Sequence, residues 1–184
     1  MSPPGARPST LEALEDQMPR QETAYGFGGT VPLPFEEAVR RTREELAKEG
    51  FGVLTEIDVA ATLKNKLDVD FAPYVILGAC NPPLAHRALA AEREIGLLLP
   101  CNVIVYAGED EGTSVISAMD PEAALSLAGN PAVAPLAAEV GARLRRVLGA
   151  LGTNSGGAPR SGEPIAPGCE GDGSLALDEC RPAT

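Results

Sequence analysis

The nine residues YVILGACNP, at positions 74–82, decide the fold of this chain. Residues 74–79 form a continuous apolar run that is short enough for a buried strand. Asn81 and Pro82 then supply an N-cap and a first-turn residue, which predicts a helix that continues to about Arg93. The strand passes directly into the helix, so Cys80 lies at the junction between the two elements.

A second junction follows in the stretch LLLPCNV, at positions 97–103. Gly96 ends the predicted helix, and an extended pattern resumes over residues 97–106. A polar turn at 107–112 separates this segment from another extended segment at 113–118, so the pair predicts an antiparallel hairpin. Cys101 lies between Pro100 and Asn102, just as Cys80 lies beside a proline and an asparagine.

Further elements are predicted on both sides of these junctions. Strands are expected over 25–31 and 53–57, and Asp58 can cap a short helix that ends near Leu67. Two longer helices are expected, one from residue 35 to a C-terminal cap at Gly50 and one over 133–151, while Asp120 and Pro121 begin another. The elements predict an α+β fold with a mixed, largely antiparallel sheet of four to five strands and a long C-terminal helix.

The ends of the chain differ in composition from its middle. Residues 1–22 begin with a cluster of Pro, Gly and Ser and predict a flexible N-terminal arm, and residues 23–151 predict one domain. Residues 152–184 are rich in Gly and Pro and are acidic, a composition that cannot bury enough apolar surface to offset the entropy of ordering. We expect a disordered tail there, and assign no role to its Cys169 and Cys180.

The charge of the chain limits its partners. There are 15 basic and 26 acidic residues, a net charge of -11, whereas nucleic-acid binders need a basic surface. No signal peptide, membrane-spanning segment or lipidation motif is visible. We therefore expect a cytoplasmic protein that binds neither nucleic acid nor membrane, in which the cysteines stay reduced.

Cys80 and Cys101 are the candidate reactive groups. Cys80 precedes a helix N-terminus, whose backbone amides and dipole favour a thiolate. The burial statistics of free cysteine favour the other interpretation, a small side chain that fills space at the end of a strand. If the strands of the two cysteines are parallel, the thiols lie about 15–20 Å apart, at opposite ends of the sheet. If the strands are antiparallel, the thiols share an edge, and a disulfide then needs Cα atoms within about 7 Å. Residues 97–100 can carry the chain back along the sheet, which favours the shared edge.

Other ionisable residues give weaker signals. Glu56 interrupts an otherwise apolar strand, and a carboxylate that pointed inward near Cys80 would have a perturbed pKa. Zinc is an unlikely cofactor, because Cys80, Cys101 and the single histidine His86 give three ligands without a C-x-x-C pair, whereas a structural zinc site needs four. We therefore identify no metal site and no cofactor.

The strings LGACNP at 77–82, GLLLPCNV at 96–103 and Asp120-Pro121 resemble the domain of unknown function 302 family, and the likeness extends from about Tyr25 to Leu151. The resemblance implies a small α+β domain whose curved sheet packs against helices and which pairs into a homodimer. It implies no established reaction.

Three functions remain open from the sequence. The first is a small ligand-binding or sensing module whose site is formed by Cys80, Asn81, Pro100, Cys101, Asn102 and Glu56. The second is a thiol-dependent redox enzyme, with Cys80 as the nucleophile and Cys101 as the resolving thiol. The third is a structural domain whose cysteines pack and whose C-terminal helix forms a homodimer.

Overall fold

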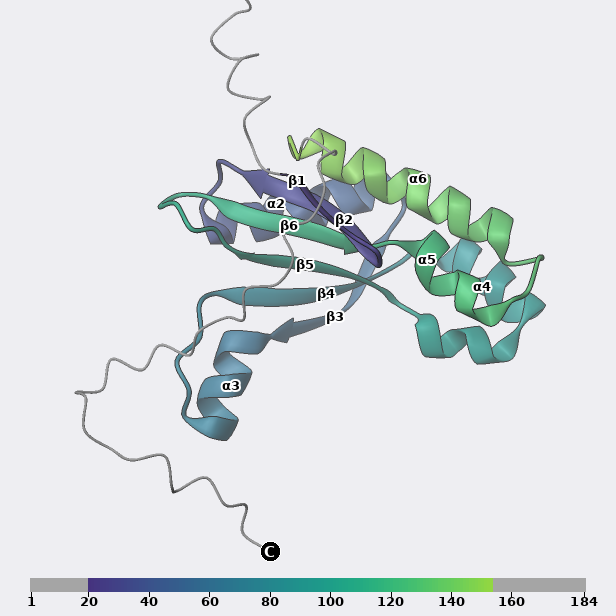
Figure 1. The fold of residues 1–184 in the computed structure, drawn as a ribbon, viewed down its shortest axis with the longest axis horizontal. Helices are drawn as coiled ribbons and strands as arrows, with labels where there is room; N and C mark the ends of the chain where they lie inside the picture. Colours follow the sequence, from purple (N-terminus) through teal and green to yellow (C-terminus); the bar gives the residue numbers. More distant parts are fainter. Residues whose placement is uncertain (1–19, 154–184) are drawn as a thin grey trace, which may run out of the picture.

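The computed structural model describes residues 20–153, and the side chains of residues 23–153 (Figure 1). Most of the expected arm and tail, together with Cys169 and Cys180, lies outside the described residues. At the C-terminal boundary, Thr153 is buried, and its hydroxyl donates a hydrogen bond to the Leu148 carbonyl at 2.8 Å. The packed structure therefore extends to Thr153.

Six antiparallel strands form a single sheet in the order β1-β2-β6-β5-β4-β3. The predicted α+β fold with a largely antiparallel sheet is confirmed, and so is the hairpin of β5 with β6. The described sheet has six strands where four to five were expected, and all of its strand pairs are antiparallel where a mixed sheet was expected. A short strand, β1, pairs with β2 and includes the last residues assigned to the arm. The strands are β1 (Arg20–Thr23), β2 (Gly26–Val31), β3 (Gly52–Asp58), β4 (Tyr74–Cys80), β5 (Cys101–Ala107) and β6 (Ser114–Met119).

Three helices begin at a side-chain cap, and a fourth ends just before a glycine with a positive φ. Asp58, Asn81 and Asp120 each accept a hydrogen bond from a first-turn backbone amide, and Gly50 follows α2 with a φ of 80°. The α-helices are α2 (Phe35–Lys48), α3 (Val59–Leu67), α4 (Pro82–Ala91), α5 (Pro121–Leu125) and α6 (Ala134–Ala150); 3₁₀ turns are η1 (Arg93–Leu98) and η2 (Ser126–Ala128).

The segment before Cys101 differs from the expectation. Residues 93–98 form the 3₁₀ helix η1, in which Ile95 is almost fully buried, so the strand expected from residue 97 begins only at Cys101. The Leu99–Pro100 peptide bond is cis. This turn reverses the chain between α4 and β5, and it brings β5 antiparallel beside β4.

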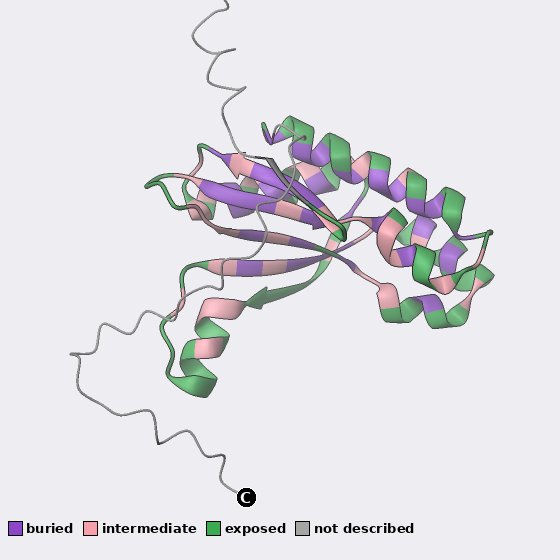
Figure 2. Cartoon of the chain, in the orientation of Figure 1, coloured by how far each residue is buried: buried purple, intermediate pink, exposed green. Residues whose placement is uncertain are grey.

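The core lies on one face of the sheet. Val75, Leu77 and Ala79 of β4 are buried there, and α2 and α6 cover the face. Figure 2 shows the buried stripe along α6, whereas α3 has no buried residue. The apolar seam expected along the C-terminal helix is buried within the domain: Val133, Leu136, Val140, Leu144, Val147 and Leu151 are each at most 9% exposed. The expectation that this seam forms a dimer is therefore wrong, because the core of one chain already uses it.

No helix within residues 20–153 combines the length and the apolar composition needed to cross a lipid bilayer.

The contact between β2 and β6 requires a glycine at position 28. A Cβ atom there would lie 2.2 Å from the Ile116 carbonyl oxygen and 2.5 Å from the Ser117 Cα atom. The glycine-rich segment 26–29 is thus part of an interior strand, and it allows close backbone approach.

We predict that Gly28→Ala lowers the free energy of unfolding by at least about 1 kcal/mol, because the backbone of β6 must move to admit the methyl group. Gly149→Ala is the matched control, since a Cβ atom there meets nothing within 4 Å and alanine favours the helix by about 0.5–1 kcal/mol. Urea unfolding of both variants measures the difference. Equal stability of the two variants would contradict the packing at Gly28.

Candidate functional site

The two central cysteines share one end of the sheet. Strands β4 and β5 are antiparallel, and the residue directly opposite Cys101 is Ala79. Because side chains alternate along a strand, Cys101 faces the core with Ala79, and Cys80 faces the other side of the sheet. Cys101 is 5% exposed, Cys80 is partly buried, and both are free thiols. The shared edge therefore brings the cysteines to neighbouring positions without aiming their thiols at each other.

Both thiols are harder to ionise than an ordinary cysteine. Burial raises the pKa of Cys80, and it raises the pKa of Cys101 to about 11, with a smaller contribution from the charge of Cys80. The pKa of Cys80 thus shifts opposite to the activation expected from a helix N-terminus. Burial is the cause of this shift. Helix α4 also offers few free amides to a thiolate, because its first two residues, Pro82 and Pro83, lack an N–H, and the Leu84 amide donates to the Asn81 side chain at 3.4 Å.

Three other expected site residues serve the fold. Asn81 is buried, caps α4 and donates from Nδ2 to the Glu49 carbonyl at 3.5 Å. Pro100 packs over β4, where a Cβ atom at position 78 would lie 2.8 Å from the proline Cγ atom. Glu56 is exposed and forms an ion pair with Arg43 of α2. These contacts explain Asn81, Pro100 and Glu56 without a ligand.

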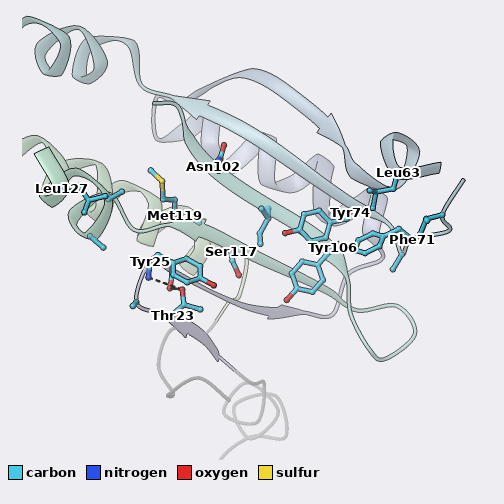
Figure 3. A pocket seen from close by; sticks show the side chains of 18 of the residues that line it. Thr23, Tyr25, Leu63, Phe71, Tyr74, Asn102, Tyr106, Ser117, Met119 and Leu127 are labelled. Atoms are coloured by element: carbon cyan, nitrogen blue, oxygen red, sulfur yellow. Dashed lines mark hydrogen bonds between the residues drawn. The ribbon is translucent and has the colours of Figure 1, made fainter. Parts of the chain in front are cut away.

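Asn102 lies instead in a large groove on the face of the sheet opposite α2 and α6 (Figure 3). The groove has a volume of about 1640 Å³. Its walls are the β1–β2 turn, the loop between α3 and β4, and the segment of α5 and η2. The side chains on its floor come from alternate positions of β4, β5 and β6: Tyr74, Asn102, Ile104, Tyr106, Ser117 and Met119.

Aromatic side chains gather at one end of this groove. The Tyr74 and Tyr106 rings are stacked with their centroids 5.3 Å apart, and Phe71 meets Tyr74 edge-on at 6.2 Å. Tyr25 lines the groove from the β1–β2 turn, next to Gly26, which pairs with Met119. All three tyrosines of the chain therefore line the groove, but only Tyr74 and Tyr106 lie at this end. Burial raises the pKa of Tyr74, and the neighbouring phenols of Tyr106 and Tyr25 raise it further. Tyr74 therefore stays neutral at physiological pH.

The aliphatic end is formed by other elements. Met119 ends β6, and Leu127 of η2 is 79% exposed. Figure 3 shows these two side chains at the opposite end from Phe71, Tyr74 and Tyr106. The groove thus has an aromatic end and an aliphatic end, with the amide of Asn102 and the hydroxyl of Ser117 between them.

The expected site contained only one residue of this groove, Asn102. The available signal was the identity of the residues that alternate with the buried ones: Tyr74 and Ile76 in β4, and Ile104 and Tyr106 in β5. An apolar run with large side chains at every position indicates a strand with two apolar faces. The helices then cover only one of these faces.

The structure brings together no metal-ligand cluster in residues 20–153, where no group of three or more His, Cys, Asp or Glu side chains is placed to hold an ion.

The fold and the groove define a small α+β domain with an antiparallel sheet that carries helices on one face. The model of the family "Domain of unknown function DUF302" matches residues 27–151, and the protein belongs to this family. The chain is 34% identical to a protein of known crystal structure, an uncharacterized conserved DUF302 protein from Bacillus stearothermophilus, with a TM-score of 0.63. The likeness covers 69% of this chain and 98% of that one. No curated protein matches the chain.

We predict that Cys80 reacts with iodoacetamide more slowly than a model peptide thiol near pH 7.5, because its raised pKa leaves less thiolate. Cys101, which is buried with a pKa of about 11, should stay unmodified in the folded protein. Mass spectrometry of the digested protein reads each cysteine separately. Alkylation of Cys80 faster than that of the model thiol would contradict the raised pKa and would support an activated Cys80.

The buried thiol of Cys101 also predicts a loss of stability at alkaline pH. Its pKa is 9.0 in the unfolded chain and about 11 in the folded one, so the unfolded chain loses the proton first as the pH rises. The protonated Cys101 thiol makes its full contribution to the stability of the folded state below pH 9, and about 2 kcal/mol of this contribution is lost by pH 11. Urea unfolding at pH 8 and 11 measures the loss of unfolding free energy over this range. The loss should be smaller in Cys101→Ala than in the unmodified protein by about 2 kcal/mol. Parallel falls in the two proteins would show that Cys101 ionises normally.

Proposed function

We propose that this protein is a small-ligand-binding module whose site is the groove on the helix-free face of the sheet. The observation that carries the proposal is the gathering of Tyr25, Tyr74 and Tyr106 with Ile104 and Met119 in one open concavity. Large apolar side chains that are exposed to water are energetically unfavourable. A cluster of them in a surface concavity therefore indicates a binding site.

The dimensions of the groove favour an elongated, largely apolar ligand. Pockets for small molecules commonly have volumes of roughly 300–1000 Å³, and this groove is larger at about 1640 Å³. A compact molecule would leave one end empty. An extended molecule can contact the stacked rings of Tyr74 and Tyr106 and also reach Leu127.

The thiol-dependent enzyme is a weaker candidate. A redox or nucleophilic thiol needs a lowered pKa, whereas burial raises the pKa of both Cys80 and Cys101. Their side chains also leave opposite faces of the sheet, which separates a nucleophile from its resolving partner. The ligand-binding function therefore moves from the cysteine junctions to the groove, and Asn102 is the residue that the two sites share.

The test uses N-phenyl-1-naphthylamine, an uncharged apolar dye whose fluorescence rises on transfer out of water. We expect the full chain to bind the dye, and Leu127→Gln to weaken binding about threefold to tenfold, because a leucine contact in the groove is lost. Leu97→Gln is the matched control, since Leu97 is 83% exposed but lies outside the groove. Both variants should melt at the temperature of the unmodified protein.

Two results would contradict the proposal. One is the absence of dye binding to a folded protein. The other is an equal loss of binding in Leu127→Gln and Leu97→Gln, which would show that the dye adheres to exposed leucines in general.

A further inference from the structure

We infer that the ligand of this groove is an elongated amphiphile with a cationic end group, bound with the cation at the aromatic end and the chain towards Met119 and Leu127. The inference rests on the proposed function, and it adds the charge and the orientation of the ligand. Three observations carry it: the charges of the lining, the aromatic rings beside those charges, and the aliphatic side chains at the opposite end of the groove.

The charged residues of the lining have one sign. Among the described residues that line the groove, Asp68 and Asp70 are charged, and none is Lys, Arg or His. Lys64 of α3 contacts the two carboxylates at 2.9 and 3.1 Å, so this group of three side chains keeps one net negative charge. An anionic ligand would find no positive partner in the lining, whereas a cationic one would find a complementary charge.

The aromatic rings lie at the same end as these carboxylates. Asp70 immediately precedes Phe71, and the Phe71 ring meets the edge of the Tyr74 and Tyr106 stack. Aromatic faces attract an ammonium group within about 6 Å of the ring centre, and the attraction is stronger where water is partly excluded. Rings and carboxylates together are suited to a quaternary or protonated amine.

The opposite end accepts an aliphatic chain. Met119, Ala123, Ala124 and Leu127 line it, and none of them carries a charge. Figure 3 shows Met119 and Leu127 at a distance from Phe71, Tyr74 and Tyr106, whereas Tyr25 lies on the Met119 side. A ligand that contacts both ends therefore needs a chain attached to its cationic group. The net charge of -11 on the whole protein further favours a cation over an anion.

A second copy of the chain is the competing occupant of the same face. Tyr25 is 74% exposed on one wall of the groove, and Val69 is 45% exposed on another, so a partner subunit could cover both. Single-sign acidic lining disfavours a self-complementary contact, because symmetry would place Asp68 and Asp70 of one copy close to acidic residues of the other. The charge of the lining therefore favours the amphiphile.

The experiment compares three probes that share one chain: octyltrimethylammonium, 1-octanol and octanoate. Isothermal titration of the full chain at low ionic strength should show the cation binding about tenfold more tightly than the alcohol, and octanoate binding more weakly than both. The preference for the cation should shrink as salt is added, because the carboxylates are exposed.

Paired substitutions test where the preference arises. Asp68→Asn with Asp70→Asn should lower the affinity for the cation severalfold and leave that for 1-octanol unchanged. Glu109→Gln with Glu111→Gln is the control, because it removes two charges from the β5–β6 turn, outside the groove. An equal effect of the two pairs would assign the preference to net charge and overturn the orientation proposed here.

The outcomes separate this inference from the proposed function. Equal or tighter binding of 1-octanol or octanoate would overturn the cationic end group and leave a ligand-binding groove standing. Failure of all three probes, together with a dimer in sedimentation that Tyr25→Glu dissociates, would assign the face to a second copy and overturn both proposals. Failure of all three probes on a monomer would likewise overturn both.

Discussion

The structure depends on one constraint: an antiparallel sheet of six strands has two faces, and the helices that form the core cover only one of them. Strand β4 shows the consequence, because Val75, Leu77 and Ala79 pack into the core while Tyr74 and Ile76 face the other way. An uncovered face is usually polar in antiparallel sheets. In this protein, β4 and β5 carry large apolar residues on the uncovered face, and these side chains form the apolar floor of the groove.

The same alternation decides the role of the cysteines. The register that pairs Cys101 with Ala79 directs its thiol into the core, where burial raises its pKa to about 11. Cys80, one residue beyond that pair, faces the opposite side. The Cys80-Asn81 and Cys101-Asn102 pairs thus lie at one end of the sheet. Their asparagines have separate roles, because Asn81 caps a helix and Asn102 lines the groove.

The starts of α3, α4 and α5 and the end of α2 could be predicted from the sequence because a residue with a direct physical effect lies at each of them. Asp58, Asn81 and Asp120 cap their helices, and Gly50 adopts the positive φ that ends α2. The absence of an activating helix end could have been predicted as well, since Pro82-Pro83 removes two amide donors.

The groove could not be predicted in the same way. It depends on which face the helices cover, and residues distant in sequence decide that. Tyr25 and Leu127 are more than one hundred positions apart, and only the pairing of β2 with β6 brings their segments to the same groove. The alternation of Tyr74 with Val75 predicts two faces but not which one stays open.

The most direct test of the groove as the binding site is an amide chemical-shift map of the full chain during titration with octyltrimethylammonium. If the ligand binds in the groove, the largest shifts should fall in the α3–β4 loop, the middle of β5 and the segment 123–127. Shifts concentrated at the cysteine junctions, residues 80–82 and 99–101, would contradict binding in the groove and return the site to Cys80 and Cys101.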